Sequence, residues 1–110
     1  MRPLTTESPI YSRFGDDEQL GEIVVQFVED MPERIAQFTS ALAADDRATL
    51  RSLAHQMKGA AGSHGFDELT LAAKRLELAL EMDDSNDGIS KAVHEFTNIC
   101  GRLRAGASSE

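Results

Sequence analysis

The fold of this chain is decided by residues 50–62, which read LRSLAHQMKGAAG. Apolar residues recur in this stretch at spacings of three and four, which is the pattern of an amphipathic α-helix. They are Leu50, Leu53, Ala54, Met57 and Ala61. Asp46 precedes the stretch as a favourable N-cap residue, and Gly62 and Gly65 favour a helix end. The sequence therefore predicts a helix from about Asp46 to Gly62.

The same spacing recurs on both sides of this stretch. It predicts a first helix that starts near Asp16 or Asp17 and reaches Met31, where Pro32 interrupts it and begins a second helix that extends past Leu42. Further helices are expected over 67–82 and 89–103. Residues 83–88 read DDSNDG, a composition typical of a turn. No alternating run of β-branched residues indicates a strand.

The expected connections between these helices are only a few residues long, which favours antiparallel neighbours. We therefore expect an all-α fold, an up-down antiparallel four-helix bundle with an additional short N-terminal helix, over residues 16–104. The segments 1–15 and 105–110 are rich in Pro, Ser, Gly and Thr. They are expected to be flexible ends of the chain.

The composition of the chain argues against several classes of function. The 110 residues include 11 Lys and Arg against 19 Asp and Glu, a formal net charge of −8, which argues against binding to nucleic acid. No apolar run is long enough to span a membrane and no apolar signal segment stands at the start, so a cytoplasmic location is expected. The single cysteine, Cys100, offers neither an internal disulfide nor a zinc spacing. A Gly-rich phosphate loop is missing, which argues against an autonomous kinase.

One histidine lies on the outer side of the central helix. If Leu50 is placed at zero on a helical wheel, His55 falls at about 140°, Lys58 at about 80°, Gly59 at about 180° and Gly62 at about 120°. Each glycine costs about 1 kcal/mol relative to alanine in a helix interior, so its position needs a reason. The two glycines either let helices pack closely or end the helix, or they leave bare backbone that another macromolecule can approach.

Residues 54–59, AHQMKG, followed by Gly65 and Leu69, resemble the signature of histidine-containing phosphotransfer (HPt) domains. The resemblance implies a four-helix bundle whose exposed His55 accepts a phosphoryl group from a receiver-domain aspartyl phosphate or a histidine kinase and passes it to a response regulator. Such a protein is a phosphoryl carrier rather than an enzyme that phosphorylates by itself. The chemistry agrees, because an exposed imidazole is largely neutral and nucleophilic near neutral pH, and Lys58 can pair with phosphoryl oxygens.

The resemblance also implies roles for residues around His55. Glu77 stands where family members often hydrogen-bond the unphosphorylated ring nitrogen, and Lys74, one turn earlier, is a possible contact to the phosphoryl group. A receiver domain is expected to dock over Gly59, Gly62 and Gln56. No metal or cofactor of its own is implied, whereas a magnesium ion is expected on the receiver.

Two other functions stay open. The chain resembles the phosphoacceptor modules of chemotaxis-type or hybrid kinases as much as free-standing carriers, and a helical adaptor without chemistry is a further alternative. Of the other histidines, His64 returns to the core side of the wheel and is interpreted as structural, and His94 as a surface residue. A monomer is expected, because each helix has one apolar face to bury.

Overall fold

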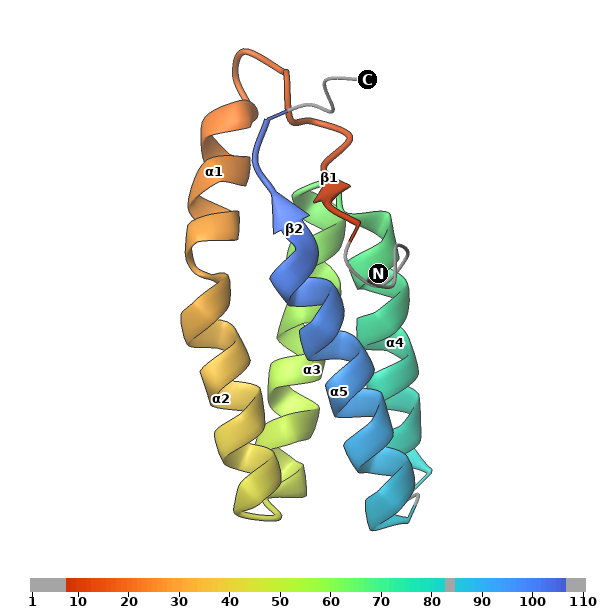
Figure 1. The fold of residues 1–110 in the computed structure, drawn as a ribbon. Coiled ribbons are helices and arrows are strands. Elements are labelled where there is room, and N and C mark those ends of the chain that lie inside the picture. The colour runs from red at the N-terminus through yellow and green to blue at the C-terminus, as the bar shows by residue number, and fades with distance from the viewer. Residues whose placement is uncertain (1–7, 83–84, 107–110) are drawn as a thin grey trace, which may run out of the picture.

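The computed structural model describes residues 8–82 and 85–106 of the chain. In this part the chain forms α1 (Gly21–Glu29), α2 (Met31–Ala43), α3 (Arg47–Ser63), α4 (Asp67–Glu81) and α5 (Asn86–Arg102). As Figure 1 shows, α1 continues the line of α2, and α2 to α5 run up and down beside one another. The predicted all-α bundle with a short additional N-terminal helix is therefore confirmed.

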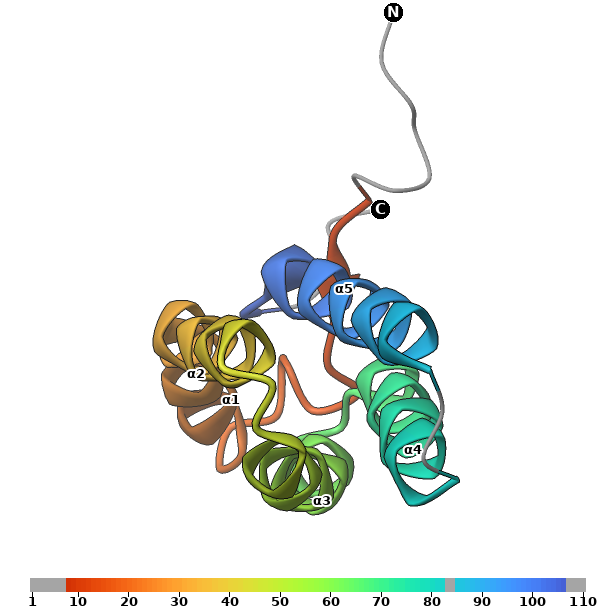
Figure 2. The ribbon, with the colours of Figure 1, turned by 90° about the horizontal axis from the view of Figure 1, so that it is seen from below.

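Seen along the helices, the bundle has four columns around one core (Figure 2). The columns follow the order of the sequence, with α1 and α2 forming the first of them. The core between them is apolar, and two of its phenylalanines, Phe38 of α2 and Phe96 of α5, lie with ring centroids 4.6 Å apart. The five apolar residues named above for their helical spacing in the 50–62 stretch all pack in or against this core, four of them fully buried and Leu53 partly. The prediction of the central helix from its apolar spacing is thus confirmed.

The capping residues determine where α3 begins and ends. The Asp46 carboxylate accepts hydrogen bonds from the backbone N–H and the hydroxyl of Thr49, at 3.1 and 2.7 Å. At the other end the backbone turns at Gly65, which has a φ of +80°. Gly62 lies within the last turn of α3 rather than after it, so only Gly65 acts as the predicted helix end.

Two predicted helix starts are wrong. The first helix begins at Gly21 rather than near Asp16 or Asp17; a turn precedes it, in which the Asp17 carboxylate accepts hydrogen bonds from the backbone N–H groups of Gln19 and Leu20. The last helix begins at residue 86 rather than 89, because the Ser85 hydroxyl accepts a hydrogen bond from the backbone N–H of Gly88 at 3.0 Å. Of the predicted turn, residues 83–84 lie outside the described part.

Residues 8–15, part of the segment predicted to be a flexible end, cross the end of the bundle (Figure 1). We call them the strap. Its strand β1 (Ile10–Tyr11) pairs in parallel with β2 (Leu103–Arg104), a feature that the sequence does not indicate. The buried Ser12 donates a hydrogen bond to the His64 carbonyl, and the backbone N–H of Arg13 donates one to the Gly65 carbonyl at 3.0 Å. Within the described residues, no helix has the length and apolarity needed to cross a membrane.

Candidate phosphotransfer site

His55 lies in the middle of α3 and its side chain is 70% exposed. The exposure follows from the wheel, because the neighbouring Ala54 and Met57 occupy the buried side of the same helix. The prediction that His55 points away from the core is confirmed. A partner can therefore reach this ring without any rearrangement of the bundle.

Glu77 of α4 joins His55 to Lys58. Its Oε2 lies 2.9 Å from Nδ1 of His55, and its Oε1 lies 2.7 Å from Nζ of Lys58. The carboxylate is only 13% exposed, whereas the Lys58 side chain is 36% exposed. One carboxylate thus holds both side chains across the contact between α3 and α4.

The two contacts of Glu77 stabilise its ionised form. The hydrogen bond from Lys58, followed by the one from His55, lowers the pKa of this carboxyl below its ordinary value, against the smaller effect of burial. Because an ionised carboxylate only accepts hydrogen bonds, Nδ1 of His55 must be the donor. A neutral ring in this position therefore carries its proton on Nδ1 and keeps the lone pair of Nε2 available for bonding.

Neither glycine beside His55 is required for packing inside the chain. A Cβ at Gly59 would meet no atom within 4 Å, and one at Gly62 would lie 3.8 Å from the Thr70 hydroxyl, an ordinary contact. Close packing of helices therefore does not explain either residue. Gln56 is exposed on α3 and lines a cavity with Glu33 and Gln37 of α2, and its amide donates a hydrogen bond to the Ser52 hydroxyl at 3.2 Å.

The structure does not bring Lys74 into the group formed by His55, Lys58 and Glu77. Lys74 is exposed on α4 and makes no hydrogen bond or ion pair within the described residues. Helical spacing places it one turn from Glu77, on a neighbouring part of the surface.

The other two histidines lie where the sequence predicts. The ring of His64 is partly buried and stacks on Phe27 with centroids 4.3 Å apart, and its Nδ1 lies 2.6 Å from the Ala60 carbonyl oxygen. This geometry fits a structural residue. His94 is exposed on α5.

The ion pair between Lys58 and Glu77 was not predicted. It joins residues 19 positions apart on two helices, and its only signal in the sequence is that each residue separately suggests a contact to His55 or to phosphate. Among the described residues, no three His, Cys, Asp or Glu side chains come together as a possible metal site.

The described residues thus form a helical bundle that exposes an imidazole, which contacts a carboxylate and lies on the same helix as a lysine and two glycines. Residues 22–106 match the Hpt domain family, and the chain therefore belongs to that family. Hpt domains act in phosphotransfer in phosphorelay signalling and interact with kinases and receiver domains. Comparison with curated proteins finds no match, and comparison with solved structures finds none either.

Proposed function

We propose that His55 is the phosphoacceptor of this chain, that it receives a phosphoryl group from a receiver-domain aspartyl phosphate or a histidine kinase, and that it passes the group to a response regulator. The observation that carries the proposal is the pair of contacts that Glu77 makes with Nδ1 of His55 and with Nζ of Lys58. They orient the exposed ring and hold a cation beside it.

The transfer step uses these groups as follows. The lone pair on Nε2 of His55 attacks phosphorus, the P–O bond to the donor aspartate breaks, and its electron pair leaves with the donor carboxylate. The ring, still protonated on Nδ1, gains positive charge, which the ionised Glu77 stabilises. Lys58 pairs with the phosphoryl oxygens, and a magnesium ion on the receiver would neutralise part of the remaining negative charge. No residue of this chain has to donate a proton to the leaving group.

Docking over Gly59 and Gly62 would bring the backbone of α3 close to the partner. Because a Cβ at Gly59 would meet no atom of the described residues within 4 Å, the surface there has room for a side chain of the partner. Gln56 would contribute an amide at the edge of the same surface. For Lys74 we propose a contact to the partner, or to the phosphoryl group once it is bound, since it has no partner within the described residues.

The test is transfer from phosphorylated receiver domains of the source organism to the purified chain, read as acid-labile phosphate. The wild type should take up label, His55→Gln should take up none while keeping its helical circular dichroism, and His94→Gln should behave as the wild type. Label on His55→Gln would overturn the assignment. Absence of label from every receiver and kinase would favour the adaptor without chemistry, and label from a kinase alone would favour a kinase module.

The chain is further proposed to act as a monomer in the cytoplasm. Sedimentation of the purified chain across a range of concentrations tests the monomer, and the cellular fraction that contains it tests the location.

A further inference from the structure

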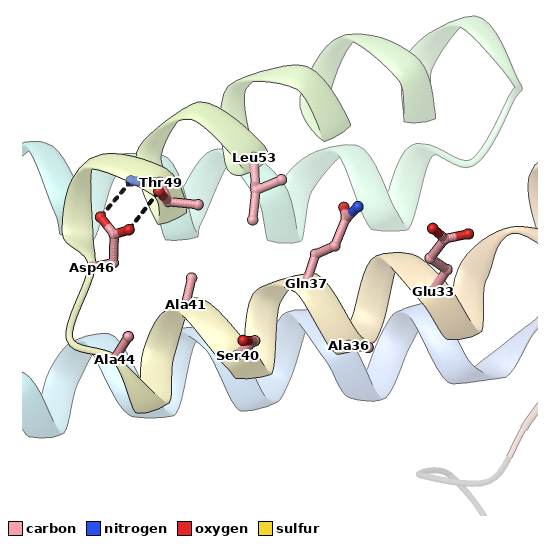
Figure 3. Close-up of a pocket in the computed structure, with 9 residues that line it drawn as sticks. All are labelled: Glu33, Ala36, Gln37, Ser40, Ala41, Ala44, Asp46, Thr49 and Leu53. Carbon is pink, nitrogen blue, oxygen red and sulfur yellow. Dashed lines mark hydrogen bonds between the residues drawn. The ribbon is translucent and has the colours of Figure 1, made fainter.

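The helix α3 meets its two neighbours differently. Toward α2 a groove of about 560 Å³ opens, which Thr49 and Leu53 line from α3 (Figure 3). Toward α4 side chains reach across the contact, where the Glu77 carboxylate contacts His55 and Lys58. We call this contact between α3 and α4 the α3–α4 seam. The position of Glu77 relative to His55 therefore depends on how firmly α4 is held at the seam.

Arg51 makes the next contact along the seam. It lies one turn before His55 on α3, and on the helical wheel it falls at about 100°, between Lys58 and His55. Its Nη2 donates a hydrogen bond to the Leu80 carbonyl oxygen of α4 at 3.3 Å. Since the two helices run in opposite directions, a residue one turn before His55 meets α4 a few positions after Glu77 (Figure 1). The two contacts thus follow one another within about one helical turn.

The acceptor of this hydrogen bond lies at the end of a helix. Leu80 belongs to the last turn of α4, where carbonyl groups lack N–H donors from the helix itself and form the negative end of the helix dipole. The backbone N–H of the C-cap residue Met82 approaches this carbonyl, whose oxygen has a second lone pair for another donor. Among the described residues, the last turn of α4 carries no basic side chain of its own. Arg51 supplies the cation from α3, and no ion pair within residues 8–82 and 85–106 draws it elsewhere.

The last turn of α4 has few other contacts that fix it. Of residues 78–82, all of them described, Leu80 alone is buried, whereas Leu78 and Met82 are 53% and 73% exposed. One buried side chain holds the turn against the core but leaves it free to rotate and to slide along α3. The hydrogen bond from Arg51 restrains both movements, because it ties the backbone of α4 to one point on α3. Such a restraint matters here since helix ends fray.

We propose that Arg51 is a positioning residue, whose hydrogen bond to the Leu80 carbonyl holds the last turn of α4 in the register that places Glu77 against Nδ1 of His55. The inference rests on the proposed function and deepens it. Glu77 lies three positions before Leu80, so a movement of this turn also moves its carboxylate. A displacement of about 1 Å would lengthen the contact of 2.9 Å between Glu77 and His55 beyond hydrogen-bonding distance.

Arg51 acts on the transfer through the proton of the His55 ring. A neutral imidazole without a fixed partner divides between two tautomers, and the one protonated on Nε2 has no lone pair there to attack phosphorus. Side chains of a helix point toward its N-terminus, so the Arg51 side chain extends away from the ring that follows it. Arg51 therefore orients the acceptor through Glu77 and does not itself contact the phosphoryl group.

The first measurement uses the isotope-labelled full chain without phosphate, at a pH where the His55 ring is neutral. In the wild type the ¹⁵N shifts of the ring should be those of the tautomer protonated on Nδ1. In Arg51→Ala they should move toward the values of a mixture of both tautomers, because part of the molecules lose the contact with Glu77. Arg51→Lys keeps one donor for the Leu80 carbonyl and should return the shifts toward those of the wild type.

The second measurement is the uptake of acid-labile phosphate from a phosphorylated receiver domain. Arg51→Ala should take up label about tenfold more slowly than the wild type without losing uptake, because His55 and Lys58 remain in place. Arg51→Lys should recover most of the rate. Unchanged ring shifts or an undiminished rate in Arg51→Ala would each overturn the proposal.

Arg75→Ala is the matched control. It also removes an arginine that ties α4 to a neighbouring helix, since Arg75 contacts Glu95 of α5 at 3.3 and 3.2 Å, but it leaves the seam intact. Ring shifts should stay as in the wild type and the uptake rate should change by less than about twofold. Equal effects of Arg75→Ala and Arg51→Ala would mean a general loosening of α4 and would contradict the proposal. A wild type that takes up no phosphate would instead count against His55 as the acceptor, and the ring shifts would still decide the role of Arg51.

Discussion

At the scale of single residues, Glu77 is the centre of the site because it contacts both His55 and Lys58. Such a bridge makes the charge state of one group depend on the others. The hydrogen bond from Lys58 is the main cause that lowers the pKa of Glu77. Lys58 therefore has two tasks in the proposed transfer: it holds the Glu77 carboxylate by an ion pair before the phosphoryl group arrives, and it pairs with the phosphoryl oxygens afterwards.

Lys58→Ala should raise the pKa of Glu77 toward its ordinary value, because the largest stabilising contact of the carboxylate is removed. In the same variant, phosphoryl transfer to His55 should slow by about 100-fold without being abolished. Carboxyl ¹³C titration measures the first effect, and label uptake measures the second. A Glu77 titration that stays where it is in the wild type would contradict the bridge.

The lowered pKa of Glu77 also sets the pH dependence of its contact with His55. A carboxyl whose folded pKa is depressed contributes stability that is present above its unfolded pKa and is lost as the pH falls through the folded value. We therefore expect the contact with Nδ1 of His55 to persist down to the ordinary range of a Glu carboxyl and to break only below it. The ¹⁵N shifts of the His55 ring, followed from neutral to acid pH in wild type and in Glu77→Gln, measure this.

Substitutions at Gly59 test the docking of the partner separately from the stability of the fold. Because a Cβ there meets nothing, Gly59→Ala should raise the free energy of unfolding by about 1 kcal/mol, the helix propensity difference. Gly59→Trp should leave stability nearly unchanged and weaken transfer from the receiver. Gly101→Trp on α5, where a Cβ also meets nothing, is the matched control and should transfer normally. A loss of stability in Gly59→Ala would favour a structural reason for this glycine.

At the scale of helices, apolar spacing and capping residues predict most of the fold. The central helix and the break at Pro32 follow from the sequence because their signals are local. The starts of α1 and α5 do not follow from periodicity. A turn that begins at Asp17 precedes α1, and the Ser85 hydroxyl decides the start of α5 through a hydrogen bond from the backbone N–H of Gly88. The run of acidic and small residues at 83–88 predicts a turn, but it does not indicate that a capping residue within the run starts the next helix earlier.

The cap of α5 can be tested. Ser85→Ala removes the acceptor for the backbone N–H of Gly88 and should lower the free energy of unfolding by about 1 kcal/mol, whereas Ser85→Asp supplies another acceptor and should keep it. Chemical denaturation measures both variants. Equal stability of Ser85→Ala and the wild type would show that the cap does not hold the start of α5.

At the scale of the whole molecule, the strap is the part that the sequence leaves unpredicted. Its two-residue pairing with β2 and its contact with Gly65 depend on residues more than 50 positions apart, and no periodicity indicates such contacts. The site shows the same limit. The exposure of His55 can be predicted from one helix, whereas the Lys58–Glu77 pair needs two helices in register.

The strap packs closely against Gly65, so substitutions there test how firmly the strap is held. Its φ is +80°, and a Cβ there would lie 2.5 Å from the Ser12 hydroxyl and 2.9 Å from the Phe14 ring. Gly106 has a similar φ of +83°, but a Cβ there would meet no atom of residues 8–82 and 85–106 within 4 Å. Gly106→Ala should therefore cost only the backbone strain, about 1 kcal/mol, and Gly65→Ala should cost at least about 2 kcal/mol. Thermal unfolding measures the stability of both variants. Equal losses of stability would mean that the strap moves aside from the added Cβ at no energetic cost.

The pairing of Ile10 with Leu103 has a consequence for the order of folding. It closes nearly the entire chain into one loop, and the entropy of closing a loop grows with its length. The helix pairs α3–α4 and α4–α5 need only short closures and can form early, whereas the two-residue parallel ladder gains little until the helices beneath it are in place. We therefore expect the amides of Ile10 to Arg13 to become protected last during refolding, after those of the helices.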